Sequence, residues 1–173
     1  MNNRKSFLSK SETESIKLWT KQIEESPEES LKSRDWSILK LNYKIAGTGK
    51  NRIVYDLDNG LVLKVSISLR GIKHNFVEYD LYNTVSSCLK DHLAAIVDHG
   101  YGWNIMEKLD VEVPRSKKNK KKVLRIYQNF IEEGIRPRDI LSKNKKNARW
   151  KNLGMDQAGK IKVLDYGDFL RWE

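Results

Sequence analysis

The stretch that decides the fold is GTGKNRIVYDLDNGLVLKV, residues 47–65. Most of it predicts a hairpin, because two runs rich in apolar residues, 52–57 and 61–66, flank Asp58-Asn59-Gly60, a tripeptide that tolerates the positive φ angles of a tight turn. Before the hairpin, the glycines of Gly47-Thr48-Gly49 allow backbone N–H groups to approach an anionic oxygen closely. Gly-x-Gly is also an ordinary turn, so this feature decides nothing by itself.

Two charged side chains, one near the end of this stretch and one after it, stand in an order that favours a joint role. Lys64 lies between apolar residues on the second predicted strand, which allows its ammonium group to point at a phosphate. Glu78 lies inside the next predicted helix, 74–89, where a carboxylate can pair with that lysine. Taken singly, the two residues are equally typical of an edge lysine and an exposed helical glutamate. Cys88 falls on the apolar face of the predicted helix, so we expect it to be buried.

Near the C-terminus, a second pair of polar residues indicates a metal site. Asp165 follows a predicted strand and opens Asp165-Tyr166-Gly167, where a carboxylate can bind a magnesium ion that bridges phosphates. Asn152, thirteen residues earlier, is a candidate second ligand of that ion. We expect residues 152–155 and 160–164 to form a closing hairpin.

Taken in order, these residues resemble the protein-kinase-like superfamily. The run 47–54 resembles the family's glycine-rich loop, Lys64 its phosphate-contacting strand lysine, and Glu78 the helix partner of that lysine. Residues 105–109, Ile-Met-Glu-Lys-Leu, resemble the hinge that receives an adenine. Asp165-Tyr166-Gly167 resembles the family's Asp-Phe-Gly motif, and its distance from the asparagine is the family's usual interval.

The resemblance covers about residues 40–169 and is similar to compact kinase-like proteins of phages and prophages. It implies an α+β fold: a kinase-like N-terminal lobe, made of an antiparallel sheet and one key helix, with a reduced C-terminal part. It also implies ATP and Mg²⁺ as ligands. In the roles that it implies, Gly47 and Gly49 approach the phosphates, Lys64 supplies charge to them, Glu78 orients Lys64, Glu107 and Leu109 hold the adenine, and Asn152 and Asp165 bind the metal.

The chain departs from the family pattern at the catalytic aspartate. The family places this residue five positions before the metal-binding asparagine, where this chain has Asn147, whose amide cannot accept a hydroxyl proton as a carboxylate can. Asp139, in the phrase Arg-Pro-Arg-Asp, resembles the family's His-Arg-Asp, but it stands thirteen residues before Asn152. A loop insertion of eight residues would restore its position and make Asp139 catalytic. Arg52 replaces the third glycine of the loop, and lies either over the phosphates or away from them.

Two functions follow from this mixture of matches and departures. One is an active minimal kinase that consumes ATP in the presence of magnesium. The other is a pseudokinase that binds a nucleotide and regulates a partner. Asn147 favours the second, and so does the end of the chain eight residues after Asp165, before the activation segment and large helical part of the family. Loss of a general base costs about 10²- to 10⁴-fold in rate, so slow transfer or autophosphorylation stays open.

Outside the matched region, the N-terminus predicts one helix. Ser11 and Glu14 have capping-box spacing, and apolar residues at helical intervals then predict a helix over 12–25. The chain is thus expected to consist of an N-terminal helical extension over 1–38, a kinase-like nucleotide-binding lobe over 39–110, and a truncated C-terminal part with a basic loop and the Asp-Tyr-Gly motif over 111–173.

The net charge of +10 is concentrated in one region. Residues 114–151 hold 14 Lys or Arg and 3 Asp or Glu, a net of +11, which leaves −1 for the rest of the chain. This asymmetry favours an acidic partner, either nucleic acid or an acidic protein, and so a third function: an inhibitor that keeps only the kinase-like fold. A solvated basic loop over 114–122 explains it equally well. The candidate contacts are Lys117, Lys118, Lys120, Lys121, Lys122 and Arg149.

Composition excludes several other classes. No run approaches the roughly 18 apolar residues of a membrane-spanning helix, and the N-terminus lacks the apolar segment of a signal peptide. The single cysteine excludes an intrachain disulfide and a cysteine-cluster metal site. We therefore expect a cytoplasmic protein that does not act at a membrane.

Overall fold

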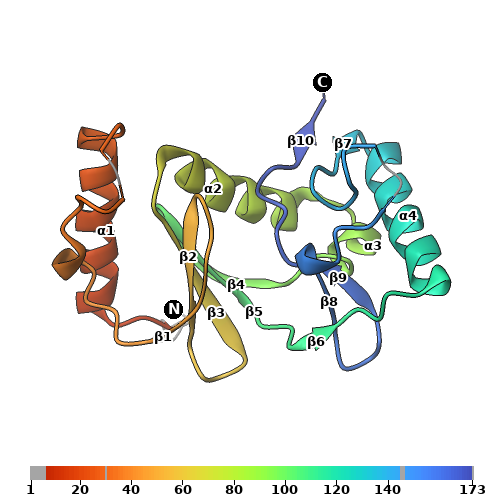
Figure 1. Ribbon diagram of the computed structural model, residues 1–173, viewed down its shortest axis with the longest axis horizontal. Coiled ribbons are helices and arrows are strands. Elements are labelled where there is room, and N and C mark those ends of the chain that lie inside the picture. Colours follow the sequence, from red (N-terminus) through yellow and green to blue (C-terminus); the bar gives the residue numbers. More distant parts are fainter. Residues whose placement is uncertain (1–6, 30, 145–146, 173) are drawn as a thin grey trace, which may run out of the picture. The chain divides into compact units, whose positions relative to one another are not determined.

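The computed structural model describes residues 7–29, 31–144 and 147–172. It has an α+β fold, as predicted (Figure 1). The chain forms two compact units, and each is described by itself. Unit 1 holds the described residues up to Phe76 together with Ile96–Met106, and unit 2 holds Val77–Ala95 together with the described residues from Glu107 onward.

Unit 1 is built on a five-stranded sheet with the strand order β1-β2-β3-β5-β4. The hairpin expected from the Asp-Asn-Gly turn is confirmed, because β2 and β3 pair antiparallel in a continuous register. The turn has positive φ angles at Asp58 (55°) and Gly60 (79°), which explains why those residue types stand there. The strands are β1 (Lys44–Thr48), β2 (Arg52–Asp56), β3 (Leu61–Ser66), β4 (Ile96–Gly100) and β5 (Trp103–Glu107).

Helix α1 (Lys10–Glu25) belongs to the core of unit 1, beside the 3₁₀ turn η1 (Trp36–Ile38). Its residues Ile16, Trp19 and Ile23 are fully buried and share one apolar cluster with residues of β2, β3 and β5. Burial of one such side chain stabilises a fold by about 1.5 to 3 kcal/mol. The Trp19 indole also donates a 2.8 Å hydrogen bond to the carbonyl of Ser66, which ties the helix to the end of β3.

The start of α1 differs from the prediction by two residues. Ser9 is the N-cap: its hydroxyl accepts from the Glu12 N–H, and the Glu12 carboxylate accepts from the Ser9 N–H at 2.7 Å. The pair named from the sequence, Ser11 and Glu14, has the same spacing but lies inside the helix. The earlier pair is used because Leu8, just before it, is buried in the core of unit 1 and fixes where the chain enters the helix.

Helix α2 (Leu69–Thr84) is followed by a separate short helix, α3 (Ser87–Lys90), so the single helix predicted over 74–89 is wrong at its end. The break occurs because Ser86 caps α3, its hydroxyl accepting from the Leu89 N–H. The break also turns Leu89 inward and leaves Cys88 exposed, which corrects the expectation that the cysteine is buried.

Unit 2 contains a three-stranded antiparallel sheet with the order β6-β8-β9. The predicted closing hairpin is confirmed by the pairing of β8 with β9, and Gly159 in its turn has a φ of 75°. The other elements surround this sheet and a small aromatic core. Those elements are α4 (Lys117–Glu132), β7 (Ile135–Arg136), η2 (Trp150–Asn152) and β10 (Leu170–Arg171), and the strands of the sheet are β6 (Val111–Glu112), β8 (Leu153–Met155) and β9 (Ile161–Val163).

Helix α4 corrects the prediction of a lysine-rich loop over 114–122. The helix begins at Lys117, where the Ser116 hydroxyl accepts from the Asn119 N–H and the Asn119 amide donates to the carbonyl of Pro114 at 2.9 Å. The apolar periodicity begins only at Val123, which is why the sequence placed the helix start there. Lysine is nevertheless a good helix former, and the cap at Ser116 stabilises the N-terminus. The helix therefore includes the basic residues 117–122 that precede the apolar pattern. In the described part of the chain, no helix is long and apolar enough to cross a membrane.

Candidate functional site

The glycine-rich segment of unit 1 is a tight connection between β1 and β2. Gly47 lies in β1 and Gly49 in the turn, where its N–H donates to the carbonyl of Arg52 at 2.9 Å. Neither glycine has a positive φ. A Cβ at Gly47 would meet no atom within 4 Å, and one at Gly49 would make only an ordinary contact of 3.5 Å with the Arg52 carbonyl. The fold itself therefore requires neither glycine, and the missing side chains leave open space beside the backbone.

Arg52, which replaces the third glycine, is buried and directed to α2. Its guanidinium donates to the side-chain oxygen of Asn75 at 3.0 Å. Asn75 uses its amide group to hold three further points of unit 1. Its nitrogen donates to the hydroxyl of Ser66 at 3.0 Å and to the carbonyl of Gly102 at 2.9 Å, and reaches the Lys64 carbonyl at 3.4 Å. The two readings of Arg52 are thus decided in favour of a structural contact with α2.

Lys64 lies in β3 opposite Val54 and is almost fully buried, with 6% of its surface exposed. A lysine is seldom buried to this extent unless its charge has a partner. This burial excludes the reading of Lys64 as an ordinary edge residue, while its contact with phosphate stays a prediction.

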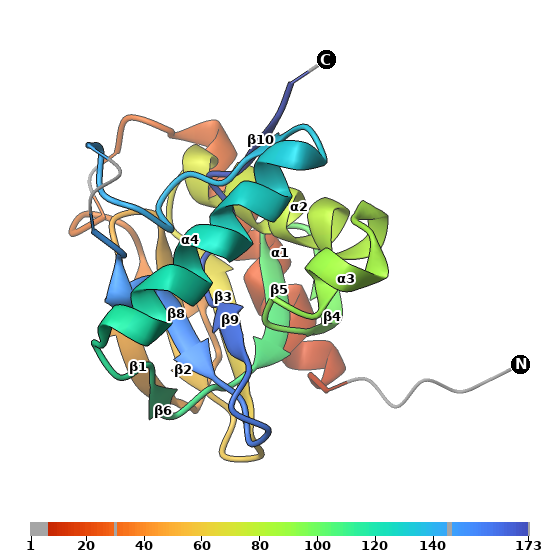
Figure 2. The ribbon, with the colours of Figure 1, turned by 90° about the vertical axis from the view of Figure 1, so that its right-hand side faces the viewer.

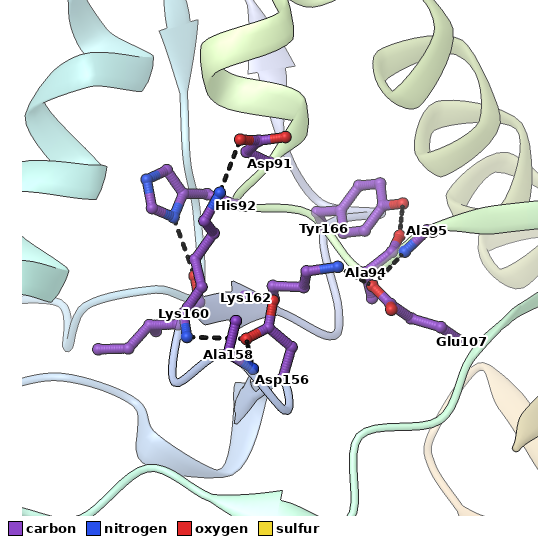
Figure 3. Close-up of polar contacts among 11 residues, drawn as sticks. Asp91, His92, Ala94, Ala95, Glu107, Asp156, Ala158, Lys160, Lys162 and Tyr166 are labelled. Atoms are coloured by element: carbon purple, nitrogen blue, oxygen red, sulfur yellow. Dashed lines mark hydrogen bonds and ion pairs between the residues drawn. The ribbon is translucent and has the colours of Figure 1, made fainter.

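Glu78, in α2, is fully buried and accepts a hydrogen bond at 3.2 Å from the backbone N–H of Tyr166. The Tyr166 hydroxyl donates in turn to the carbonyl of Ala94 at 2.8 Å (Figure 3). The ring packs near Phe169, which meets Phe130 edge to face at 5.3 Å. Glu78 is therefore tied to the Asp-Tyr-Gly motif inside unit 2. Its pairing with Lys64 stays a prediction.

Asp139 and Asn152 are brought together by the loop that separates them. The side-chain amide of Asn152 donates to the backbone carbonyl of Asp139 at 2.9 Å. Between them, Leu141 and Ala148 form an antiparallel bridge, and the Ser142 N–H donates to the carbonyl of Asn147 at 2.8 Å. The described residues on either side of 145–146 are thereby paired, and Asp139 lies within hydrogen-bonding distance of Asn152. The catalytic role of Asp139 stays a prediction.

The carboxylate of Asp139 is held by a neighbouring arginine. Arg149 approaches it at 2.9 Å, and the Arg149 N–H donates to the carbonyl of Ile140 at 2.8 Å. Asp139 itself has a φ of 67°, a left-handed conformation that is uncommon for residues other than glycine and is often found at functional sites. Arg149 thus holds the carboxylate of the candidate catalytic residue, and its contact with an acidic partner stays a prediction.

Asp165 follows β9 and is exposed. The preceding residue, Leu164, donates its N–H to the carbonyl of Asn152 at 2.8 Å. One residue, Asn152, therefore connects the backbone before Asp165 with the backbone of Asp139. Among the described residues there is no cluster of three or more His, Cys, Asp or Glu that could hold a metal.

The hinge candidates of unit 2 are fixed by side-chain contacts. The carboxylate of Glu107 accepts from the Ala95 N–H at 2.7 Å and pairs with the Lys162 ammonium at 2.5 Å, and the Glu107 N–H donates to the Ala95 carbonyl (Figure 3). Leu109 packs on β8, where a Cβ added to Gly154 would come within 2.7 Å of the leucine Cβ. The ion pair of Lys162 with Glu107 could not be predicted from local patterns, because the two residues lie 55 positions apart in the sequence.

A second ion pair of unit 2 joins Lys160, just before β9, to Asp91, just after α3. Lys160 donates to the carboxylate of Asp91 at 2.7 Å, and His92 contacts the carbonyl of Ile161 at 2.9 Å (Figure 3). The hydrogen bond from Lys160 lowers the pKa of Asp91, and the same bond raises the pKa of Lys160. The short segment between α3 and β4 is thereby bound to β9 through both side chains and backbone.

The predicted basic contacts lie mostly on one helix. Lys117, Lys118, Lys121 and Lys122 are exposed on the first two turns of α4, and Lys120 is partly buried there. Arg149 is the exception, since it faces Asp139 as described above. The contact of these lysines with an acidic partner stays a prediction.

Comparisons of the sequence find no match: no protein-family model matches the chain, and neither does any curated protein. The structure does match solved structures. The 2.2 Å crystal structure of WbdD has a TM-score of 0.54 at 17% identity, covering 76% of this chain and 34% of that chain. The medium-resolution structure of the bifunctional kinase-methyltransferase WbdD has a TM-score of 0.50 at 17% identity, covering 71% and 31%. The co-crystal structure of WbdD with the kinase inhibitor LY294002 has a TM-score of 0.51 at 16% identity, covering 76% and 34%.

The fold is kinase-like. At these identities the similarity shows the fold alone, and the chain spans about one-third of the length of the WbdD chains that it matches. The five-stranded sheet and α2 correspond to the expected N-terminal lobe, and unit 2 contains the reduced C-terminal part. The resemblance stated from the sequence is thus confirmed for the fold.

Proposed function

We propose that this chain binds ATP together with magnesium. The observation that carries the proposal is the hydrogen-bonded connection through Asn152, which joins Asp139 to the backbone that presents Asp165. These three residues were assigned to nucleotide chemistry from the sequence, and two of them are separated by an insertion. A merely structural loop has no need to fold back so that one particular aspartate meets one particular asparagine.

In unit 1, the proposal assigns the phosphates to the glycine segment and Lys64. The glycines leave space that neither the φ angles nor packing explains, so an anionic oxygen can approach the backbone there, although the Gly49 N–H itself already donates to the Arg52 carbonyl. Lys64 would supply a positive charge from a buried position, where an ionic interaction is stronger than in water.

In unit 2, the proposal assigns the metal to Asn152 and Asp165 and the adenine to the segment from Glu107 to Leu109. A bound magnesium ion would neutralise charge on the phosphates. Asn152 donates through its amide nitrogen, which leaves the side-chain oxygen as the acceptor that a metal requires. The Glu107 carboxylate is engaged by Lys162 and Ala95, so the adenine would be recognised by the backbone of this segment rather than by that side chain.

We further propose that Asp139, and not Asn147, is the general base if the chain transfers phosphate. Its carboxylate is oriented by Arg149 at 2.9 Å, and a carboxylate can accept the proton of a hydroxyl substrate. A chain that only binds nucleotide and regulates a partner would keep the same fold. The two functions differ in whether the Asp139 carboxylate affects turnover.

Thermal unfolding with and without ATP and magnesium tests the binding proposal. At a ligand concentration 100 times the dissociation constant, a ligand that binds only the folded state stabilises it by about 2.7 kcal/mol. For a chain of this size, this corresponds to roughly 5 to 11 °C in Tm. We expect a shift of this order in the wild-type protein, and a clearly smaller one without magnesium.

The matched variants are Asp165→Asn and Glu132→Gln. Both remove one negative charge from an exposed carboxylate of unit 2 without changing its shape. We expect Asp165→Asn to abolish most of the magnesium-dependent part of the shift and Glu132→Gln to leave it intact. An unchanged shift in Asp165→Asn would reject the metal assignment, and the absence of any shift at saturating ATP would reject nucleotide binding.

A further inference from the structure

A hollow of about 380 Å³ lies in unit 2 beside α4, between α3, the segment that follows it and the β8–β9 turn. We call it the α4 groove. Figure 2 looks onto α4, with α3 beside it. The side chains of Ile126 and Ile161 form an apolar floor, and Cys88 lies at its edge. None of the residues assigned above to nucleotide, metal or proton transfer lines this groove.

The rim of the α4 groove is cationic. Lys122, Arg125 and Lys160 line it, and no acidic residue does. Lys122 and Arg125 are one helical turn apart, and Lys118 continues the same stripe by one further turn. Within residues 7–29, 31–144 and 147–172, neither Lys122 nor Arg125 has an ion-pair partner, whereas Lys160 pairs with Asp91.

The charges of α4 are placed against its own dipole. The first turn of the helix contains no acidic residue, and it is occupied by lysines, although the N-terminus of a helix favours negative charge. The helix nevertheless forms, because its cap and its buried face stabilise it. Lys118, on the same stripe as Lys122 and Arg125, lies in this first turn, so an anionic group that extends from the groove to Lys118 would relieve the unfavourable arrangement. Lys122 and Arg125 lie beyond the first turn and attract an anion by their own charge.

From these features we infer that the α4 groove binds an acidic segment of another protein, with an apolar side chain on the isoleucine floor and carboxylates against Lys122 and Arg125. The apolar floor distinguishes this occupant from a nucleic acid. Single-stranded nucleic acids are held mainly by aromatic side chains on which the bases stack. Among the described residues that line the groove there is no Phe, Tyr or Trp, and the imidazole of His92 already contacts the carbonyl of Ile161. This inference is independent of nucleotide binding.

The test uses the full chain and a fluorescein-labelled peptide of six glutamates with one central leucine, followed by fluorescence polarisation at about 50 mM salt. A second peptide replaces the leucine by glycine. We expect the leucine peptide to bind at least tenfold more tightly than the glycine peptide, because only the former has an apolar group for the floor. Equal binding of the two peptides would overturn the inference.

Charge reversal on α4 provides the matched variants. Arg125→Glu changes the rim of the groove, and Lys121→Glu makes the same change on the same helix at an exposed position that does not line it. We expect Arg125→Glu to weaken the leucine peptide at least tenfold and Lys121→Glu less than threefold. Equal losses would indicate general charge attraction and overturn the inference, as would undetectable binding to the wild-type protein.

Cys88 supplies a second, independent readout. It is the one cysteine of the sequence, it is exposed, and it lines the groove. Its rate of alkylation by iodoacetamide, a neutral reagent, should fall at least fivefold when the leucine peptide is saturating, and should not fall in Arg125→Glu at the same peptide concentration. If the peptide does not slow the alkylation of Cys88, it binds outside the α4 groove. Tighter binding of a thymidine octanucleotide, with the same dependence on Arg125, would assign the groove to nucleic acid instead.

Discussion

Replacing Gly47 by alanine tests whether the glycine is needed by the fold or by a ligand that approaches its backbone. A Cβ at this position would meet no atom within 4 Å, and the φ angle is not left-handed, so alanine fits the folded chain. Because alanine also restricts the unfolded chain, we expect the variant without ligand to be more stable by about 0.4 to 1 kcal/mol. For a chain of this size, that is an increase of roughly 1 to 4 °C in Tm.

With ATP and magnesium present, the expectation reverses. If phosphate oxygens approach the backbone beside Gly47, the added methyl group occupies the space that they need. A tenfold loss of affinity is about 1.4 kcal/mol, which removes roughly 3 to 6 °C of the ligand-induced increase in Tm. We would measure Tm by differential scanning fluorimetry over an ATP series at constant magnesium, and fit the dissociation constant of each variant. A Gly47→Ala protein with the wild-type response to ATP would refute the assignment of this segment to phosphate.

Gly60→Ala is the control for this experiment. A Cβ there also meets no atom within 4 Å, but the φ angle of 79° is unfavourable for alanine and costs about 1 to 2 kcal/mol. We therefore expect the opposite pattern, a lower Tm without ligand and an unchanged dissociation constant for ATP. If both variants lost affinity equally, the effect would come from the hairpin as a whole rather than from the space at Gly47.

Three further predictions concern single side chains. Tyr166→Phe removes the donor to the buried Ala94 carbonyl, so the free energy of unfolding measured in urea should fall by about 1 to 3 kcal/mol; a loss below about 0.5 kcal/mol would contradict this reading. A hydrogen bond to Glu12 raises the pKa of Tyr43 from 10.0 to about 12. The bond therefore stabilises the fold fully below pH 10 and is lost as the pH rises through 12, so Tm in that range should fall more steeply in the wild type than in Tyr43→Phe. If the chain transfers phosphate, Asp139→Asn should lower the rate of ATP turnover about 10²- to 10⁴-fold with little change in ATP-induced Tm, whereas equal turnover would exclude Asp139 as the base.

The parts of the fold that the sequence predicted correctly are those specified by short-range signals. The hairpin of β2 and β3 follows from the Asp58-Asn59-Gly60 turn. Positive φ angles were expected at Asn59 and Gly60, and the structure has them at Gly60 and at Asp58 instead of Asn59. The closing hairpin of β8 and β9 follows in the same way from Gly159. Because a two-strand turn is fixed by the few residues within it, no knowledge of the rest of the chain was needed.

The helices were predicted less well, because their ends depend on side-chain caps that compete with one another. Ser9 and Ser11 each have a glutamate three residues later, and only the burial of Leu8 selects the first. The start of α4 was predicted too late, because its first residues are mostly lysines and carry no apolar periodicity. The N-cap at Ser116 was therefore not recognised. In each case, the residue type permitted several boundaries and tertiary packing chose among them.

The candidate site depends on contacts between residues far apart in the sequence, which periodicity does not reveal. The order of Lys64, Glu78, Asn152 and Asp165 was sufficient to indicate the fold, because order along the chain is a property of the sequence. The pairing of Glu107 with Lys162 could not be predicted in this way, because the two residues are 55 positions apart and no motif connects them. Spacing alone left Asn147 and Asp139 as alternatives, and the choice between them as the base stays a prediction. The Leu141–Ala148 bridge and the hydrogen bond from Asn152 to the Asp139 carbonyl are contacts that spacing does not reveal.

The contacts of Asn152 make it an unsuitable residue to substitute in a test of catalysis. Asn152 holds the backbone carbonyl of Asp139, not its carboxylate, so this connection is maintained whether or not residue 139 is acidic. A scaffold that only binds nucleotide would need the Asn152 amide but not the Asp139 charge, except to pair with Arg149. Asp139→Asn retains the shape and the backbone contact while removing the proton acceptor. An Asn152 substitution would disturb the loop contact and the proposed metal site together, so it cannot separate a kinase from a pseudokinase as the change at Asp139 can.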